Sequence, residues 1–154
     1  MNVLEAKMQK SAYADEAHLV LLIDGQPLDH IIHAVDPEDK LRLKGLVPTL
    51  LHWLENEEER RVTWSRVLPE DGHCAVAPIL MCPDDCDFTC TVIVVEINHS
   101  NDIITWQRIG RDISFSTIPE KIGTAVEWFD LPQYRFERSA YQTCLKLFGE
   151  KLEK

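Results

Sequence analysis

The chain has 154 residues, of which 45% are hydrophobic and 27% are charged, as expected for one globular domain with a hydrophobic core. Its formal net charge of −10 argues against binding to nucleic acid or to an anionic membrane surface, because both depend on Lys and Arg. No apolar run approaches the roughly 18 residues of a membrane span, and residues 1–17 lack the apolar core of a secretory signal. A cytoplasmic location is therefore expected. The five cysteines, an odd number, cannot all pair internally, so reduced thiols are the simplest expectation.

The N-terminal part predicts a strand followed by a helix. Residues 1–17 are expected to be a polar, flexible lead-in to the domain. The apolar run at 18–23 predicts a strand that ends at the Asp24-Gly25 turn. Apolar residues at 28, 31, 32 and 35 have the spacing of one helix face and predict a short helix.

The next segment predicts a charged loop, a helix and a strand. The loop covers 36–45, and the helix begins near Pro48, a residue favoured in a first helical turn. The charged run 55–61 reads as the solvated end of that helix. The period then changes to two, and residues 62–68 predict a strand.

The middle of the chain predicts three more strands. Residues 74–81 are expected to pair with 62–68 in a hairpin, with an edge or a bulge at Pro78, which lacks a backbone donor. The β-branched run within 88–97 predicts a central strand with both faces covered. A turn at 98–102 leads to a further strand at 103–109.

The C-terminal part predicts two helices. One begins near Pro119 and packs through Ile122, Val126 and Phe129. The other carries apolar residues from Phe136 to Phe148 and ends at Gly149. Together the elements predict a single α+β domain, residues 1–154, in which helices pack on one face of an antiparallel β-meander of about five strands.

Acidic residues are concentrated in a stretch without bases. Residues 67–107 contain seven acids and no Lys or Arg. Five of these acids, all expected at strand ends, are candidates for a surface that binds a basic partner: Glu70, Asp71, Asp84, Asp85 and Asp87. Trp106 lies on a neighbouring predicted strand, and Trp is enriched at binding hot spots, so it is the candidate aromatic anchor. Solubility alone is the competing explanation of the acidic excess.

A metal site is the second chemical possibility. Cys82, Cys86 and Cys90 are spaced four apart, with His73 upstream, and thiolates and imidazole suit zinc. However, structural zinc sites use two separate Cys pairs, and Cys is also a common small core residue. No nucleophile, dinucleotide or phosphate-loop motif occurs, so no catalytic residue, cofactor or metal is expected.

Two segments resemble a known family. The run Leu46-Val47-Pro48-Thr49-Leu50-Leu51 with Trp53-Leu54, and the stretch from Pro78 to Glu96, look like immunity proteins of bacterial polymorphic toxin systems, including contact-dependent inhibition. The resemblance covers roughly residues 19–130. It implies a small, acidic, cytoplasmic protein that neutralises one toxin domain, often a basic nuclease.

The expected function is therefore that of a non-enzymatic binding protein, an immunity protein that occludes a cognate basic toxin. The alternatives are a metal-dependent enzyme that uses Cys82, Cys86 and His73, or a small accessory domain of a larger assembly.

Overall fold

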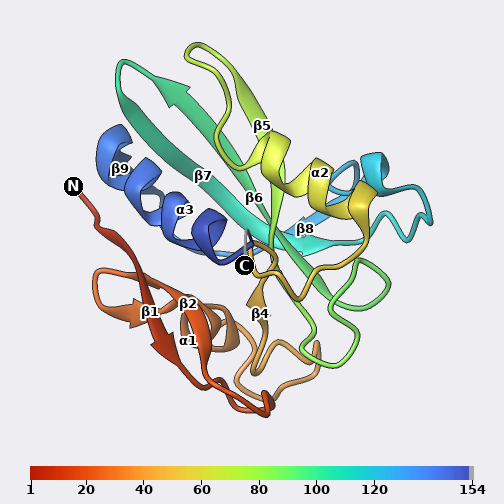
Figure 1. Ribbon diagram of the computed structural model, residues 1–154. Coiled ribbons are helices and arrows are strands. Elements are labelled where there is room, and N and C mark those ends of the chain that lie inside the picture. Colours follow the sequence, from red (N-terminus) through yellow and green to blue (C-terminus); the bar gives the residue numbers. More distant parts are fainter. Residues whose placement is uncertain (153–154) are drawn as a thin grey trace.

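A large antiparallel sheet forms the centre of the molecule (Figure 1). The computed structural model describes residues 1–152. The sheet has the order β4-β5-β6-β7-β8, with β9 also paired to β7. Its strands are β4 (Val47–Pro48), β5 (Cys74–Met81), β6 (Val92–Ser100), β7 (Ile103–Asp112), β8 (Val126–Trp128) and β9 (Tyr134–Glu137).

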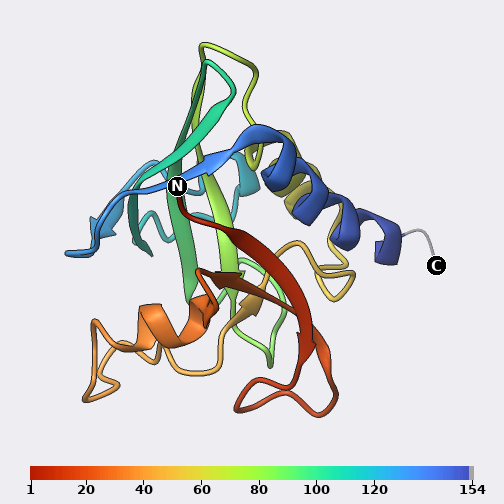
Figure 2. The ribbon, with the colours of Figure 1, turned by 90° about the vertical axis from the view of Figure 1, so that its left-hand side faces the viewer.

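A smaller antiparallel sheet and the helices complete the domain. The small sheet contains β1 (Leu4–Gln9), β2 (His18–Ile23) and β3 (Gln26–Pro27). The helices are α1 (Leu28–His33), α2 (Glu57–Arg66), α3 (Arg138–Leu152) and the 3-10 helix η1 (Pro119–Lys121). Figures 1 and 2 show α2 and α3 on the same side of the large sheet. The fold is α+β with an antiparallel sheet, as the sequence predicts.

The strand β6 is the central strand of the meander. It pairs with β5 on one side and with β7 on the other. Ile93 and Val95 belong to the main core, whereas Val92 and Val94 pack in a second, smaller cluster, so both faces of β6 are covered. The predicted irregularity at Pro78 is confirmed, because the β5–β6 register shifts between Pro78 and Leu80.

The N-terminal segment is a strand, which corrects the expectation of a flexible lead-in. β1 pairs along its whole length with β2, from Leu4 opposite Ile23 to Gln9 opposite His18. Gln9 and the residues just before it are exposed, so the segment reads as polar in sequence. The pairing comes from β2 across a long loop, which local composition cannot reveal.

The predicted order of helix and strand between 46 and 68 is wrong. Residues 46–51 are buried on all sides and form β4 and a series of turns, so they have no exposed helix face. The helix begins at Glu57, nine residues after Pro48, because Asn56 caps it by accepting a hydrogen bond from the Glu59 amide at 3.0 Å. Three glutamates in the first turn add favourable charge at the positive end of the helix dipole. The predicted strand at 62–68 therefore lies largely in α2.

The helix predicted near Pro119 is reduced to η1, followed by β8. Gly123 has a φ of +82° and packs closely on Val76, which ends the helical turn. β8 then pairs with β7 beside Gly110, where an added Cβ would lie 2.5 Å from the Glu127 carbonyl oxygen. The absence of a side chain at Gly110 thus lets the backbones of β7 and β8 approach each other closely.

The C-terminal helix is confirmed with different ends. Phe136 lies in β9 rather than in the helix, and α3 continues through Gly149 to Leu152. Its buried face includes Tyr141, Cys144 and Phe148, which pack into the main core.

Candidate functional site

The loop between β5 and β6 carries three of the candidate acids and is closed by a disulfide. Cys82 and Cys90 are bonded, with Cα atoms 6.1 Å apart. Cys86 lies inside the closed loop, where its amide donates to the Cys82 carbonyl oxygen at 3.0 Å. Three cysteines are free: Cys74, Cys86 and Cys144. The expectation that all thiols are reduced is therefore corrected, and Cys82 and Cys90 cannot serve as zinc ligands while they are bonded.

The acids of this loop lie in one cluster. Asp84 and Asp85 are exposed, and Asp87 accepts hydrogen bonds from the amide and hydroxyl groups of Thr89. Burial raises the pKa of the Cys86 thiol, and so do the nearby charges of Asp87, Asp84, Asp85 and, from the segment before α2, Glu55. We call Glu55, Asp84, Asp85 and Asp87 the acidic cluster. No side chain of the cluster forms an ion pair within residues 1–152.

Glu59 borders the acidic cluster from the first turn of α2. Its side chain is buried, at 7% exposure, and Oε2 accepts a hydrogen bond from the Phe88 amide at 3.3 Å. Oε1 is buried without a hydrogen-bond partner. Burial raises the pKa of the Glu59 carboxyl, and the charge of Asp87 raises it further. Glu59 is thus a carboxyl group with half of its acceptor capacity unfilled.

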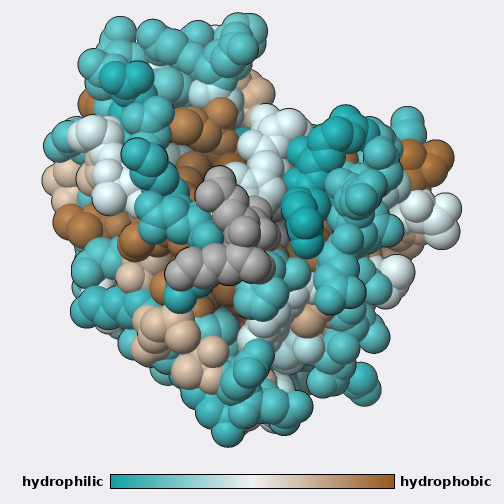
Figure 3. All heavy atoms as spheres, viewed as in Figure 1, coloured by the Kyte–Doolittle hydropathy of each residue, from teal (hydrophilic) through white to brown (hydrophobic). Residues whose placement is uncertain are grey.

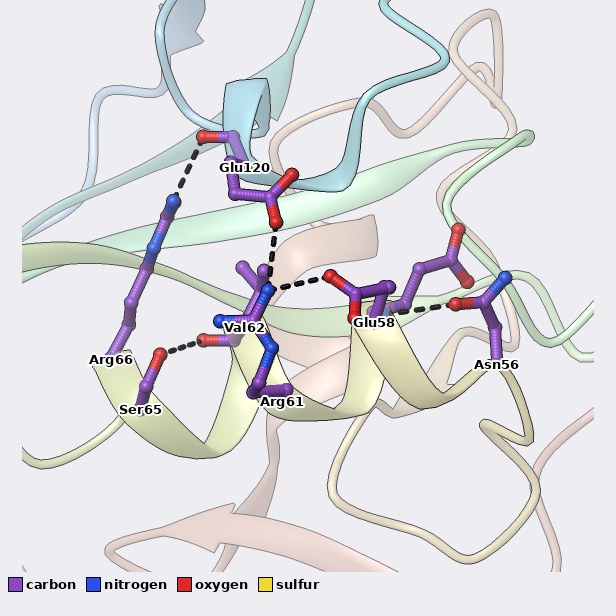
Figure 4. A network of polar contacts seen from close by, with 8 residues as sticks. Asn56, Glu58, Arg61, Val62, Ser65, Arg66 and Glu120 are labelled. Atoms are coloured by element: carbon purple, nitrogen blue, oxygen red, sulfur yellow. Dashed lines mark hydrogen bonds and ion pairs between the residues drawn. The ribbon is translucent and has the colours of Figure 1, made fainter.

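The arginines of α2 hold η1 against the helix (Figure 4). The Arg61 guanidinium lies between Glu58 at 2.5 Å and Glu120 at 2.8 Å. Arg66 donates to the backbone oxygens of Glu120, at 2.8 Å, and of Ile122, at 2.9 Å. These contacts, from the middle and the C-terminal end of α2, fix the segment between β7 and β8 beside the helix.

A groove of about 770 Å³ runs between the N-terminus of α2, the disulfide loop and the segment between β7 and β8. Glu59 and Phe88 lie on its wall. Phe115, 82% exposed, and Ile118, 52% exposed, line it from the segment between β7 and β8. Phe115 has a φ of +50°, which is uncommon for a residue other than glycine. In Figure 3, apolar atoms at the right-hand edge lie next to the hydrophilic surface over α2.

A second groove, of about 730 Å³, lies between α1 and β8. Apolar side chains such as Ile31, Val35 and Phe129 dominate its lining. It contains none of the buried unpartnered polar atoms found within residues 1–152, whereas the groove beside α2 contains two, in Glu59 and Arg111. We therefore place the candidate site at the groove beside α2, which we call the α2 groove.

The structure separates the five acidic candidates into two groups. Glu70 and Asp71 are exposed in the loop before β5, where Asp71 accepts a hydrogen bond from the Asn101 amide at the β6–β7 turn. The Asp84–Asp87 group follows the other end of β5. The eight residues of β5 put about 23 Å between the two ends of the strand. Glu70 and Asp71 therefore do not share a surface patch with the acidic cluster.

Trp106 is a core residue, which corrects its assignment as an exposed anchor. Its side chain is fully buried. The ring packs edge-on against Phe136 at a centroid distance of 5.3 Å, and Nε1 donates to the Tyr141 hydroxyl at 3.3 Å. A partner has no access to this side chain in the folded domain.

Residues 67–107 contain no Lys or Arg, but in the folded domain two of their acids form ion pairs with arginines from other segments. Glu96 pairs with Arg108 at 2.9 Å, and Asp102 pairs with Arg138 at 3.1 Å. Both arginines come from outside residues 67–107, so Glu96 and Asp102 are balanced by bases in the folded domain. Glu70, Asp71 and the acids of the disulfide loop form no ion pair within residues 1–152.

The residues of the alternative metal site, Cys82, Cys86 and His73, do not come together in the fold. His73 follows Asp71 at the far end of β5 from Cys82, so the two cannot share an ion. Within residues 1–152, no group of three or more His, Cys, Asp or Glu side chains is arranged to hold a metal ion.

Sequence reasoning missed Glu55, Glu59 and Phe115. The charged run at 55–61 predicts a solvated helix end, although Asn56 followed by three glutamates is a recognisable helix start. No sequence pattern marks Phe115, because its exposure depends on the path of the segment between β7 and β8.

Comparison with protein-family models, with curated proteins and with solved structures finds no match to this chain. None of the helices described in residues 1–152 has the length and apolar character needed to cross a bilayer.

Proposed function

We propose that this chain is a non-enzymatic binding protein that recognises a basic protein partner through the acidic cluster. In the family that its sequence resembles, this is the role of an immunity protein that occludes a cognate basic toxin domain. A cytoplasmic location belongs to the same proposal, although the Cys82–Cys90 bond is of a kind that is rare in the reducing cytosol.

The carrying observation is the unpaired acidic cluster on a loop held by a covalent bond. Glu55, Asp84, Asp85 and Asp87 have no ion-pair partner within residues 1–152, and the Cys82–Cys90 bond ties the two ends of the loop together. Like charges held close together repel one another, and a basic partner would relieve that repulsion. Complementary charge of this kind raises the rate of association more than it lengthens the lifetime of the complex.

The test compares two double variants with identical changes in net charge. Asp84→Lys/Asp85→Lys alters the acidic cluster, and Glu70→Lys/Asp71→Lys alters the opposite end of β5. Binding is measured by stopped-flow against the product of the gene adjacent to that of this chain, between 20 and 300 mM salt.

We expect Asp84→Lys/Asp85→Lys to slow association at low salt by about tenfold or more and to flatten its salt dependence. Glu70→Lys/Asp71→Lys should have a much smaller effect. Equal effects of the two variants would mean that only net charge matters. An adjacent gene product that neither binds this chain nor is neutralised by it would refute the immunity role.

A further inference from the structure

The α2 groove has the chemistry of a receptor for one arginine side chain. Acids predominate on its described lining, with Glu58, Glu59 and Asp112 against Arg111. Glu58 is paired with Arg61, whereas Oε1 of Glu59 is buried and has no partner. The charge of Arg111 is partly balanced, because Nη2 lies 3.5 Å from Glu127. Glu59 is therefore the acceptor in the groove that an entering donor would complete.

Two aromatic side chains line the groove together with this acceptor. Phe88 follows the acidic cluster in sequence and is half-buried, and Phe115, in the segment between β7 and β8, is 82% exposed. A guanidinium group stacks on aromatic rings and is weakly hydrated, whereas a lysine ammonium is compact and strongly hydrated. The groove therefore favours arginine over lysine.

We propose that the basic partner inserts an arginine side chain into the α2 groove, where it stacks on Phe115 and donates to Glu59. This inference rests on the proposed function and adds the anchor that Trp106 cannot supply. Oε1 is covered in the free protein, so part of the groove lining moves aside as the donor enters. The Phe88 amide is held to the other oxygen, Oε2, by a single hydrogen bond of 3.3 Å, a contact that costs little to break.

The acidic cluster and the groove have separable roles in this arrangement. The cluster attracts any positive charge, since its exposed carboxylates act through long-range electrostatics. The groove distinguishes arginine from lysine, since stacking and a directed donor depend on the shape of the cation.

Two peptides of equal charge test the proposal: acetylated, amidated hexa-arginine and hexalysine. Each is titrated at low salt into uniformly ¹⁵N,¹³C-labelled protein, and amide shifts and the Glu59 carboxyl pKa are followed by NMR. Both peptides should shift the amides of 84–87. Hexa-arginine alone should shift the amides of Phe88, Phe115 and Ile118, and it should lower the pKa of the Glu59 carboxyl.

Variants separate a direct role from a structural one. Phe115→Ala and Glu59→Gln should each weaken hexa-arginine binding by about fivefold and leave hexalysine binding unchanged. Leu147→Ala, an exposed apolar residue on α3, should change neither. Phe115→Trp, which keeps an aromatic face, should retain the preference for arginine.

Three outcomes count against the proposal or its basis. If both peptides shift only residues 84–87, the groove is not an arginine receptor, while the acidic recognition surface stands. If Phe115→Ala and Glu59→Gln weaken both peptides equally, their role is structural and the inference fails. If neither peptide shifts the acidic cluster at low salt, the proposed function fails together with the inference.

Discussion

Trp106 and Phe115 show how burial decides the role of an aromatic residue. Trp106 has its indole donor satisfied by Tyr141, whose hydroxyl in turn donates to the Val67 carbonyl oxygen at 2.6 Å. This chain of hydrogen bonds lets a polar group stay in the core without cost. Phe115 is not packed in the core, and its side chain is exposed to solvent where it lines the α2 groove. Residue type alone favours Trp106, and only packing transfers the candidate role to Phe115.

At Glu59 the same reasoning gives a prediction about pH. Burial raises the pKa of this carboxyl above its ordinary value of 4.5, so the folded state binds a proton more readily than the unfolded chain does. Between the ordinary pKa and the raised folded pKa, stability therefore falls as pH rises. Above the raised pKa, the free energy of unfolding is lowered by the full cost of burying the Glu59 carboxylate, which has a hydrogen-bond partner for only one of its two oxygens.

Glu59→Gln removes this cost and keeps an oxygen that can accept from the Phe88 amide. We expect the variant to be more stable than the wild type by about 1 kcal/mol at pH 7 and to have no advantage at pH 4. Urea unfolding at the two pH values measures the difference. Glu58→Gln, at an exposed neighbouring position, is the control and should show no such gain. A stability change for Glu59→Gln that is the same at both pH values would contradict the prediction.

The disulfide loop is the element on which the site depends. Three aspartates in nine residues would favour an open, solvated chain, because their charges repel one another. The bond between Cys82 and Cys90 restricts that freedom in the unfolded chain as well as in the folded one. Burial and the adjacent acids together raise the pKa of Cys86, so its thiol is a poor nucleophile toward the neighbouring disulfide.

Removal of this disulfide gives the prediction for the element. Closure of a loop with a sequence separation of eight is worth about 2.5 kcal/mol by the chain-entropy relation. Cys82→Ser/Cys90→Ser should therefore lower the free energy of unfolding by about that amount, and amide exchange in the loop should become faster. Cys86→Ser, inside the same loop, is the control and should be close to neutral. A reducing agent that leaves the stability of the wild type unchanged would show that the bond contributes nothing.

At the scale of the whole molecule, β1 joins the two sheets. Asn2, just before β1, donates its backbone N–H to the Arg135 carbonyl oxygen in β9 at 2.8 Å. Its side-chain oxygen accepts from the Arg135 amide at 2.8 Å, and its Nδ2 donates to Asp24 at 2.7 Å. Asp24 also accepts from the Val3 amide at 2.7 Å. One asparagine thus connects the large sheet with the turn that follows β2.

Asn2→Ala should lower stability at pH 7 by about 1 kcal/mol, because it removes both side-chain contacts. The hydrogen bond from Asn2, followed by that from the Val3 amide, lowers the pKa of Asp24. Its contribution is therefore present above the ordinary pKa of Asp and is lost as pH falls through the lowered value. The destabilisation should shrink at pH 2.

Amide hydrogen exchange along β1 and β9, with urea unfolding at both pH values, measures this effect. Gln9→Ala, at the exposed end of β1, is the control and should change neither strand. If Asn2→Ala leaves the exchange of both strands unchanged, the connection between the sheets does not depend on this side chain.

Several elements could be predicted from sequence because their signals are local. The strand 18–23, the strand 74–81 with its irregularity at Pro78 and the strand core at 92–97 each follow from apolar or β-branched runs bounded by turn residues. The α+β class follows from the order of these elements. The errors at 1–17 and near Pro119 share another cause. In both, a distant strand or a close backbone contact determined the structure, and local propensity is weaker than such packing. The error at 62–68 differs, because the helix start at Asn56 is itself a local signal.

For the candidate site, residue order alone predicts that Asp84, Asp85 and Asp87 lie together, because residues within one short loop cannot be far apart. The other features of the site depend on how the chain folds. The tertiary structure brought Glu55 and Glu59 to that loop and separated Glu70 and Asp71 from it. It also buried Trp106 and placed Phe115 along the groove. The length of β5 separates Glu70 and Asp71 from the disulfide loop, and the contacts between α2 and η1 determine where the segment between β7 and β8 lies. Neither distance can be read from the order of the residues.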